Sequence, residues 1–529
     1  MIEHHERLGL SRRSFLAASA ATAAAGVVGS ASSCSSASHA AASDGAATFD
    51  AGRARPGAPN ILFIISDDHR YDYLSCRDHP VIRTPNMDRV AGEGALCENA
   101  FVTTSLCSPS RASIITGVYA HIHGVLDNRT MVPEALPSYP VLMQKAGYDT
   151  AYIGKWHMGA HTDAPRPGWS HWCSFVGQGS YADQPFNVNG ARTTPPPGEH
   201  TTDAITRLST DWLKSRDKTK PFCLCVGHKA PHDPFGYPAR FAGMYADAQL
   251  IQPMPDTDAN YRTLPRWVRT QRNSWHGVDG MYDGRINFRT FWYDYLRSIT
   301  SVDDSIGTLL QTLTDLGQLD NTLVVYIGDN GFQAGEHGLI DKRTAYEPSM
   351  RIPMLAMWKG VIPPGQRIKD QLLNIDLPCL FLEAAGLKQP PTFQGRPPLA
   401  SLASRIPDPK TSIRDAWLYE YFFERDFPQT PTIFAVRTPK WKYIESYGVW
   451  DGAELYDLAS DPAEMTNLAK IEAHKATVLD MRATLNRLVY HTGARRDPLW
   501  AAHGLTPDFL GHCETPPWPS GDPPLPRGS

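Results

Sequence analysis

Two pairs of oxygen-bearing side chains suggest a metal site. Asp67 and Asp68 directly follow one strongly apolar run, and Asp329 and Asn330 directly follow another. Their side-chain oxygens are hard donors with no Cys or His among them, a set that suits Ca²⁺ or Mg²⁺ better than Zn²⁺. Taken alone, an Asp-Asp pair is more typical of a turn or a helix cap. The metal prediction therefore depends on what lies between the two pairs.

A compact motif lies between them. Cys107 begins the run Cys-Ser-Pro-Ser-Arg, which ends at Arg111 and continues to a Thr-Gly pair at 116–117. This run resembles the Cys-x-Pro-x-Arg signature of the sulfatases, the formylglycine-dependent branch of the alkaline-phosphatase-like superfamily. In that family the cysteine is oxidised to formylglycine, whereas the sequence shows only the encoded residue. The resemblance extends from about residue 60 to residue 468.

Further segments resemble the family in the family's own order. They are Gly-Lys-Trp-His at 154–157, Lys-Ala-Pro-His at 229–232, Gly-Asp-Asn-Gly at 328–331, Gly-Glu-His-Gly at 335–338 with Lys342, and Glu-Leu-Tyr-Asp-Leu at 454–458 with Asp461, Pro462, Asn467 and Leu468. Each segment alone is a weak to moderate match. Together and in this order they favour the sulfatase family over an accidental similarity.

The resemblance implies a cofactor and a nucleophile. The metal would be Ca²⁺, with Mg²⁺ less favoured because it prefers to retain waters. Its ligands would be Asp67, Asp68, Asp329, Asn330 and the residue at 107. Formylglycine in its hydrated form carries two hydroxyls on one carbon. One would attack sulfur to give a covalent sulfate, and deprotonation of the other would expel sulfate.

The resemblance also implies a catalytic set. A sulfate ester carries spread negative charge, so its transition state requires cations and a metal. Lys155, Lys342 and His232 would supply that charge. His157 would take the proton of the second hydroxyl, and His232 or Lys342 would protonate the leaving alcohol. Arg111 would hold the hydroxyl of formylglycine. The implied catalytic residues are Cys107, Arg111, Lys155, His157, His232 and Lys342.

Each of these side chains also has an ordinary structural interpretation. A single histidine is more often a satisfied structural residue, and lysines are usually solvated surface charges. Unmodified Cys107 would be a small buried residue. Three function classes therefore stay open: a sulfatase, a formylglycine-dependent phosphodiesterase or phosphonate monoester hydrolase, and a Ca²⁺-dependent carbohydrate-binding relative in which Cys107 is never converted.

Alternating strands and helices must position these segments. Continuous apolar runs at 60–66 and 323–328 are typical of buried central strands. Further strands are expected at 150–153, 222–226 and 353–357, and helices at 139–146 and 293–316. In α/β folds, ligands gather at the carboxyl ends of the strands. We expect an α/β fold, and the resemblance implies an alkaline-phosphatase-like large mixed β-sheet flanked by helices, with a smaller C-terminal α+β subdomain.

The chain of 529 residues divides into four predicted parts. They are an export signal and linker at 1–45, a catalytic domain at 58–405, an α+β subdomain at 410–495 and an irregular Pro-rich tail at 496–529. Hydrophobic residues make up 42%, which supports a large core. Lys plus Arg number 51 against 55 Asp plus Glu, a balance that argues against nucleic-acid binding. No apolar run is long enough for a mature membrane-spanning helix.

The N-terminus is typical of an export signal. Ser-Arg-Arg-Ser-Phe-Leu at 11–16 precedes an Ala-rich stretch, as in substrates of the twin-arginine (Tat) route. The alternative is a flexible Ala-rich tail. Cys34 has only a weak lipoprotein context. The predicted partners are the Tat export machinery and a formylglycine-installing enzyme, and the predicted location is periplasmic, cell-surface or extracellular.

One segment suggests the substrate. Residues 261–283 carry cationic and aromatic side chains: Arg262, Arg266, Arg269, Arg272, Trp267, Trp275 and His276. Such a set suits a sugar ring that bears acidic groups, although a surface loop with buried Trp anchors explains it equally well. This segment and residues 417–421 look most like carbohydrate sulfatases of the N-acetylglucosamine-6-sulfatase kind. A small sulfated saccharide, with 6-sulfo-N-acetylglucosamine as first choice, is therefore the predicted substrate.

Overall fold

The computed structural model describes residues 49–251, 258–404, 412–447 and 452–494. The predicted export signal, Cys34 and the predicted Pro-rich tail lie outside these described residues. Within the described ranges, no helix is both long enough and apolar enough to cross a membrane.

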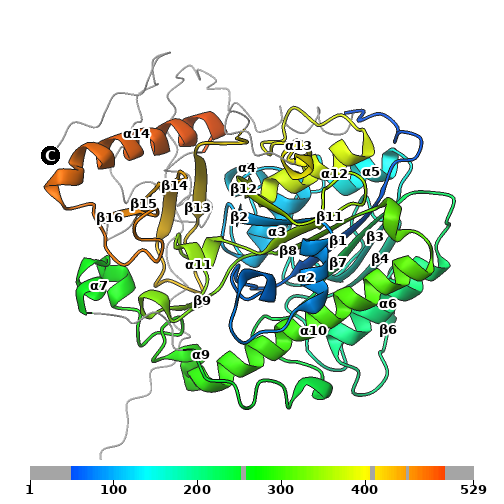
Figure 1. The fold of residues 1–529 in the computed structure, drawn as a ribbon, viewed down its shortest axis with the longest axis horizontal. Coiled ribbons are helices and arrows are strands. Elements are labelled where there is room, and N and C mark those ends of the chain that lie inside the picture. Colours follow the sequence, from blue (N-terminus) through cyan, green and yellow to red (C-terminus); the bar gives the residue numbers. More distant parts are fainter. Residues whose placement is uncertain (1–48, 252–257, 405–411, 448–451, 495–529) are drawn as a thin grey trace, which may run out of the picture. The chain divides into compact units, whose positions relative to one another are not determined.

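A ten-stranded mixed sheet forms the centre of the molecule (Figure 1), with the strand order β12-β2-β11-β8-β1-β7-β3-β4-β5-β6. Its middle strands β8 (Thr322–Gly328), β1 (Asn60–Ser66), β7 (Phe222–Gly227) and β3 (Asp149–Lys155) run parallel to one another. Nearly every residue in them is buried, as expected for strands covered by helices on both faces. This burial explains why their sequences are continuously apolar rather than alternating.

The outer strands complete the sheet on both sides. On one side lie β11 (Met354–Met357), β2 (Ala95–Phe101) and β12 (Gln366–Leu373), and on the other lie β4 (His171–Phe175), β5 (Phe186–Val188) and β6 (Ala191–Thr193). Strand β11 is antiparallel to both of its neighbours, and β5 is antiparallel to β4 and β6. The sheet is therefore mixed, and the predicted α/β fold class is confirmed.

Helices cover both faces of the sheet. Alternate residues of β1 point to opposite faces, so Phe63 and Leu62 belong to two different hydrophobic cores. The first core includes residues of α3 (Cys107–Thr116), α5 (Tyr139–Lys145) and α12 (Leu377–Ala385). The second includes residues of α2 (Pro85–Gly92), α6 (Thr201–Ser215) and α10 (Phe288–Asp315), and α6 and α10 run side by side in Figure 1.

The predicted elements agree with this arrangement apart from shifts at their ends, of which the largest is at the start of α10. The helix expected at 293–316 begins five residues earlier, at Phe288. The side chain of Asn287 accepts a hydrogen bond from the backbone N–H of Thr290 at 2.9 Å and so caps the helix. The buried Phe291 and Trp292 continue the apolar spacing of the helix toward this cap, so the sequence pattern extends further than the predicted start.

A separate four-stranded antiparallel sheet follows in the sequence. It consists of β13 (Trp417–Tyr421), β14 (Thr432–Arg437), β15 (Trp441–Tyr447) and β16 (Gly452–Asp457) in that order. Helix α14 (Lys475–Thr492) packs on this sheet through Met481, Leu485 and Val489 (Figure 1). The expected smaller C-terminal α+β structure is therefore present.

A largely buried histidine connects the short helix α4 (Ala120–His123) to the C-terminal sheet and to helix α14. His121, on α4, contacts Glu420 of β13 through Nδ1 at 2.7 Å and the carbonyl oxygen of Thr492 through Nε2 at 2.9 Å. Both partners are acceptors, so both ring nitrogens donate when the imidazole is protonated. Burial opposes that charge, but the carboxylate of Glu420 outweighs burial and raises the pKa of His121 above its usual value.

This contact predicts a pH-dependent contribution to stability. Because the folded-state pKa of His121 is raised, the contribution is complete below the unfolded-state pKa of about 6.5 and is lost as pH rises through the folded-state pKa. We expect His121→Gln to lower the free energy of unfolding by about 3 kcal/mol at pH 6 and by clearly less at high pH. Urea unfolding at several pH values measures this, with exposed His161→Gln as control. A deficit that is constant with pH would contradict the assignment.

Candidate active site

The carboxyl ends of β1 and β8 bring the two predicted oxygen-bearing pairs together. The strands are in parallel register, with Ser66 opposite Gly328. The backbone N–H of Asp329 donates to the carbonyl of Ser66 at 2.9 Å, and the backbone N–H of Asp68 donates to Asp329 Oδ1 at 3.1 Å. Asp68 and Asp329 are more than 250 residues apart in the sequence, and the parallel pairing of β1 and β8 brings them into direct contact.

Three carboxylates meet at this point. Carboxylate oxygens of Asp67, Asp68 and Asp329 all lie within 4.8 Å of one another, and all three side chains are buried. Burial raises the pKa of Asp68 to about 6, although Lys342 opposes the shift. Asn330 donates to Asp68 Oδ1 at 2.7 Å through Nδ2, and its own Oδ1 is buried without a hydrogen-bond partner among the described residues. This cluster offers the hard oxygen donors that a Ca²⁺ or Mg²⁺ ion requires, so the residues present fit such an ion.

Cys107 lies beside these carboxylates, at the first position of α3. Its Sγ donates to Asp67 Oδ1 at 3.3 Å, and the side chain is fully buried. Potential ligand atoms of Asp67, Cys107 and His232 lie within 4.8 Å of one another. Burial raises the pKa of the Cys107 thiol to about 12. An unmodified thiol here stays protonated and is a poor nucleophile.

Arg111 follows Cys107 by one helical turn and therefore faces the same cluster. Its Nε donates to Asp329 Oδ2 at 2.8 Å, Nη1 donates to the carbonyl of Lys155 at 2.5 Å, and Nη2 lies 3.8 Å from Asp67 Oδ2. The guanidinium thus bridges the carboxylates that follow β1 and β8. The contact with Asp67 is too long for a hydrogen bond, and no described residue accepts one from Nη2.

Two buried lysines flank the carboxylates. Lys155, at the end of β3, contacts Asp67 and Gln178 through Nζ. Lys342 donates to both carboxylate oxygens of Asp68, at 2.6 Å each. Each lysine therefore lies next to a different aspartate. Burial opposes the charge of Lys342, but the Asp68 carboxylate outweighs burial and raises the pKa of Lys342 well above its usual value. Burial lowers the pKa of Lys155 well below its usual value, so Lys342 is the lysine that keeps its positive charge in the free protein.

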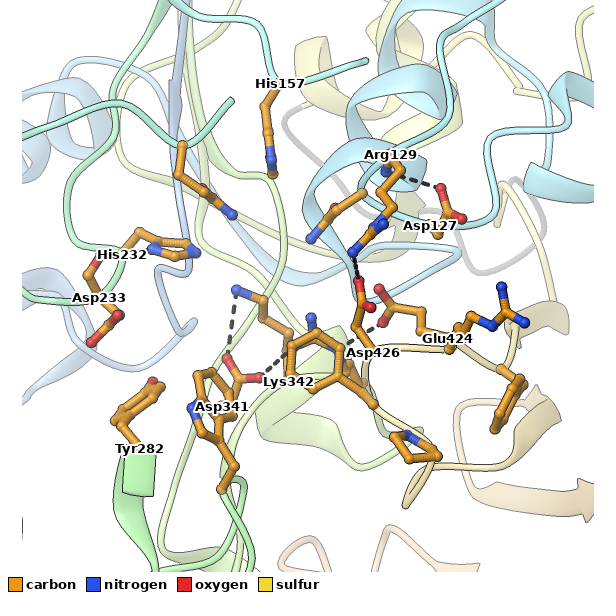
Figure 2. A pocket seen from close by; sticks show the side chains of 18 residues that line it. Asp127, Arg129, His157, His232, Asp233, Tyr282, Asp341, Lys342, Glu424 and Asp426 are labelled. Carbon is orange, nitrogen blue, oxygen red and sulfur yellow. Dashed lines mark hydrogen bonds and ion pairs between the residues drawn. The ribbon is translucent and has the colours of Figure 1, made fainter. Parts of the chain in front are cut away.

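The two predicted histidines line the same cavity, shown in Figure 2. His157 has a left-handed backbone with φ of 55°, and Ser108 Oγ donates to its carbonyl. His232 contacts the carbonyl of Asp233 through Nδ1 at 2.9 Å, and its Nε2 lies 3.8 Å from Asp68 Oδ2. Burial, reinforced by nearby lysines, lowers the pKa of both histidines well below the usual range. Both imidazoles are therefore neutral near pH 7 in the free protein.

The cavity has a volume of about 850 Å³. It is lined by Asp127, Asn128, Arg129, His157, Gln178, His232, Asp233, Trp275, Tyr282, Asp341, Lys342, Arg343 and residues 423–428. The last segment is the loop between β13 and β14, so both sheets contribute to the walls. All ten predicted site residues lie in this cavity or in the cluster that adjoins it.

The predicted sugar-binding segment reaches the cavity only in part. Trp275 lines it, whereas Trp267 is buried and donates to Ser446 Oγ at 3.1 Å. Arg272 donates to Asp279 at 2.5 Å and is not among the lining residues. Arg272 therefore pairs with Asp279 outside the cavity lining, and its role in sugar recognition stays a prediction. The nearby Trp267 serves as a packing anchor.

Sequence reasoning missed a charged wall of the cavity. Arg343 donates to Glu424 Oε1 at 2.7 Å and to Asp341 Oδ2 at 2.5 Å, and its guanidinium lies 3.8 Å from the ring centre of Phe427. Asp341 and Arg343 could have been suspected from the sequence, because they are the immediate neighbours of the predicted Lys342. Nothing in the sequence indicated Glu424 or Phe427, because they are adjacent to Arg343 only in the folded chain.

Comparison with known proteins identifies the family. Residues 59–387 match the family model described as Sulfatase, and residues 335–491 match the model described as N-sulphoglucosamine sulphohydrolase, C-terminal. The chain belongs to the sulfatase family. This sulfatase is accordingly a sulfuric ester hydrolase, as its named relatives indicate.

Individual relatives of this sulfatase extend the comparison. It is 31% identical to the N-acetylglucosamine-6-O-sulfatase of Bacteroides thetaiotaomicron over 78% of its own length and 82% of that relative. A solved structure in complex with its substrate D-glucosamine-2-N,6-O-disulfate superimposes with a TM-score of 0.74 at 30% identity, covering 83% of this chain and 99% of that one. The phosphonate monoester hydrolase of Agrobacterium radiobacter shares the fold, with a TM-score of 0.66 at 21% identity, covering 82% and 96%.

Proposed function

We propose that this sulfatase releases sulfate from a small sulfated saccharide, with 6-sulfo-N-acetylglucosamine as the first candidate. The observation that carries the proposal is the convergence of residue 107, three carboxylates, two lysines and two histidines at one end of the cavity. Its volume of about 850 Å³ suits a saccharide, and Trp275 offers an apolar face for a sugar ring. The N-acetylglucosamine-6-O-sulfatase described above is named for sulfated N-acetylglucosamine, and the solved structure described above holds a glucosamine disulfate as its substrate.

The metal ligands proposed are Asp67, Asp68, Asp329 and Asn330 together with residue 107. Four oxygen donors in a buried acidic cluster favour Ca²⁺ over Mg²⁺, which retains more of its waters. We assign formylglycine, formed from Cys107, as the nucleophilic residue. When bound, the ion supplies Lewis-acid charge, and the hydrated formylglycine supplies the attacking hydroxyl.

The lysines and Arg111 stabilise negative charge in this proposal. Lys342 contributes fixed positive charge where sulfate oxygens would gather, and Lys155, on the other side of the aspartates, donates hydrogen bonds there and gains charge as the anion binds. Arg111 orients Asp329 through its 2.8 Å contact, and its Nη2, which has no hydrogen-bond partner among the described residues, would hold the hydroxyl of formylglycine. Because these groups are buried and already oriented, little reorganisation is needed during the reaction.

The two histidines move protons. His157 is neutral in the free protein and has no hydrogen bond to Nδ1 from the described residues, so it can accept the proton of a hydroxyl at residue 107. The Nδ1–H of His232 donates to the carbonyl of Asp233, so Nε2 carries no proton in the neutral imidazole of the free protein. In this proposal Nε2 gains a proton in the substrate complex, where the anionic ester stabilises the imidazolium, and then passes it to the leaving alcohol. Lys342 is the alternative donor.

The role of His232 predicts a dependence on the leaving group. An alkyl alcohol needs a proton as it leaves, whereas 4-nitrophenolate leaves without one. We expect His232→Asn to lower kcat/KM by about 10²- to 10⁴-fold for a sugar sulfate and far less for 4-nitrophenyl sulfate. Steady-state kinetics on both esters measures this, with His474→Asn, which is outside the cavity lining, as control. Equal losses on both esters would assign the proton to Lys342.

A second candidate function is a formylglycine-dependent phosphodiesterase or phosphonate monoester hydrolase. A multifunctional alkaline phosphatase superfamily protein of Trinickia caryophylli is 27% identical over 80% of this chain and 93% of that protein. The hydroxyl of formylglycine at residue 107 would attack a phosphorus ester in the same way as a sulfate ester. Comparing kcat/KM for 6-sulfo-N-acetylglucosamine, a phosphodiester and a phosphonate monoester separates the candidates. Faster cleavage of either phosphorus ester than of every sulfate ester would favour the second.

Trp275 tests the saccharide assignment. Binding energy from remote parts of a substrate accelerates only substrates that use it. We expect Trp275→Ala to lower kcat/KM for the sugar sulfate by about tenfold or more and to affect 4-nitrophenyl sulfate much less. The ratio of the two values is the measurement. Equal losses would place the role of Trp275 in packing against Tyr282, whose ring centre lies 4.4 Å away.

We also propose export by the Tat route to the periplasm, cell surface or exterior. The Ser-Arg-Arg-Ser-Phe-Leu run at 11–16 supports this route. The Tat machinery and a formylglycine-installing enzyme would then be the partners. For the domain organisation, we propose a catalytic domain at 58–405 and an α+β subdomain at 410–495.

A further inference from the structure

Most cations that line the cavity are already paired. Arg129 lies 2.6 Å from Asp426, Arg343 donates to Glu424 and Asp341, and Lys342 donates to Asp68. The remaining lining cation, Arg425, is exposed to solvent. The lining also carries five carboxylates, of Asp127, Asp233, Asp341, Glu424 and Asp426. Away from the sulfate end, the described walls therefore hold no buried cation that is free to receive another anion.

Asp233 is the lining carboxylate with the fewest contacts. No Lys, Arg or His side chain of the described residues lies within 4.0 Å of it, and no described residue donates a hydrogen bond to it. Lys229 Nζ donates instead to the backbone carbonyl of Asp233, at 3.2 Å. Figure 2 shows the carboxylate on the His232 side of the cavity. A half-buried carboxylate without a donor favours a ligand that brings one.

Tyr282 provides an independent sign of a ligand next to Asp233. Its side chain is 1% exposed, and its hydroxyl has no hydrogen-bond partner among the described residues. The hydroxyl is turned toward the cavity in Figure 2. The backbone of Tyr282 is left-handed, with φ of 50°, and so is that of Asp283, with φ of 59°. Such strain in non-glycine residues is concentrated at ligand-binding sites. Packing against Trp275 and Phe235 holds the ring in place.

We infer that Asp233 and Tyr282 form a specificity subsite that binds a neutral hydrogen-bond donor of the saccharide, a hydroxyl or amide N–H, and disfavours a second anionic group. The inference rests on the proposed saccharide sulfatase function. A hydroxyl can donate to Asp233 and accept from Tyr282, which satisfies both unused groups. A second sulfate would instead meet the Asp233 carboxylate, and no buried lining cation of the described residues is free to pair with it; the nearby Lys229 is already bound to the backbone carbonyl of Asp233 and does not line the cavity. Repulsion of this kind discriminates between substrates by about 10- to 100-fold.

Asp233→Asn tests the repulsive part. Asn keeps an acceptor oxygen and the backbone contacts to Lys229 and His232, but it removes the charge. We expect the wild type to prefer 6-sulfo-N-acetylglucosamine over glucosamine 2-N,6-O-disulfate. The variant should shift the ratio of kcat/KM values toward the disulfate by about tenfold or more. Added salt should shift the wild-type ratio in the same direction, because screening weakens repulsion. Asp279→Asn, outside the cavity lining, is the control and should leave the ratio unchanged.

Tyr282→Phe tests the hydrogen-bonding part. Removing a buried hydroxyl that has no partner should leave the Tm unchanged or slightly higher. The same change should lower kcat/KM for 6-sulfo-N-acetylglucosamine about tenfold relative to 4-nitrophenyl sulfate, because the aryl ester lacks the hydroxyl. The matched control is Tyr293→Phe, whose hydroxyl donates to the carbonyl of Ala248 outside the cavity lining. A lower Tm with equal losses on both esters would show a structural role.

The outcomes separate this inference from the function on which it rests. If the wild type hydrolyses sugar sulfates but prefers the disulfate, or if Asp233→Asn leaves the ratio unchanged, the subsite is wrong and the saccharide function stands. If the wild type hydrolyses 4-nitrophenyl sulfate and neither sugar sulfate, the saccharide function fails and the subsite fails with it. A third outcome is that the wild type prefers an unacetylated amino sugar and that Asp233→Asn abolishes this preference. That result would show that Asp233 binds the ammonium group of the sugar instead of a neutral donor.

Discussion

Replacing Cys107 with Ser should lower kcat/KM for sulfate esters by at least about 10³-fold, as expected when a nucleophile is removed. An installing enzyme that oxidises only Cys cannot convert Ser, and a Ser hydroxyl lacks the second hydroxyl of the hydrated aldehyde. The fold should persist, because Ser is nearly isosteric and can donate to Asp67 as Cys107 does. Sulfate release measures the first effect, and thermal unfolding measures the second.

A matched control for this substitution lies in β2. Cys97 is also fully buried, but it lies outside the cavity and the carboxylate cluster. Cys97→Ser should therefore retain sulfate release per folded molecule, whatever it does to stability. Wild-type turnover by folded Cys107→Ser protein would show that residue 107 is not the nucleophile.

Asp329→Asn should remove metal and activity together. The side chain of Asp329 accepts from the Asp68 backbone through Oδ1 and from Arg111 through Oδ2, so the substitution weakens the centre of the cluster. Changes to groups that only orient metal ligands cost about 10- to 100-fold, and we expect at least about 100-fold for a direct ligand. Bound calcium per chain and kcat/KM, measured on the same preparation, should fall in parallel.

Two further measurements make the metal prediction specific. Excess Ca²⁺ should restore part of the lost activity, because weakened binding is opposed by ligand concentration. Asp320→Asn, which alters an exposed carboxylate paired with Lys359, should change neither quantity. If a strong chelator stripped the wild type of metal and turnover continued, the ion would have no part in the reaction.

The sequence predicts the centre of this site well, because the relevant information is local. Continuous apolar runs mark β1 and β8 as buried strands, and a polar pair at the end of each marks the same edge of the sheet. Parallel pairing then brings Asp67 close to Asp329. Arg111 follows Cys107 by four residues, so a helix suffices to place both on one face.

The cavity walls could not be predicted in the same way. Trp267 and Trp275 occur in one segment with similar neighbours, and only tertiary packing buries the first against Ser446 and leaves the second at the cavity. Glu424 lies 81 residues from Arg343 and meets it because the β13–β14 loop reaches the main sheet. Tyr282 has a left-handed backbone although it is not a glycine, so its residue type gives no signal of that conformation. Long-range contacts of this kind have no periodic sequence pattern.

The mass of the peptide that contains residue 107 tests the central claim most directly. The peptide should be taken from a preparation of the native host that releases sulfate. Conversion of Cys to formylglycine exchanges two hydrogens and sulfur for one oxygen. The account therefore predicts a lighter peptide that a hydrazide labels through its aldehyde. A peptide of unmodified mass with a free thiol, found in protein that still releases sulfate, would contradict it.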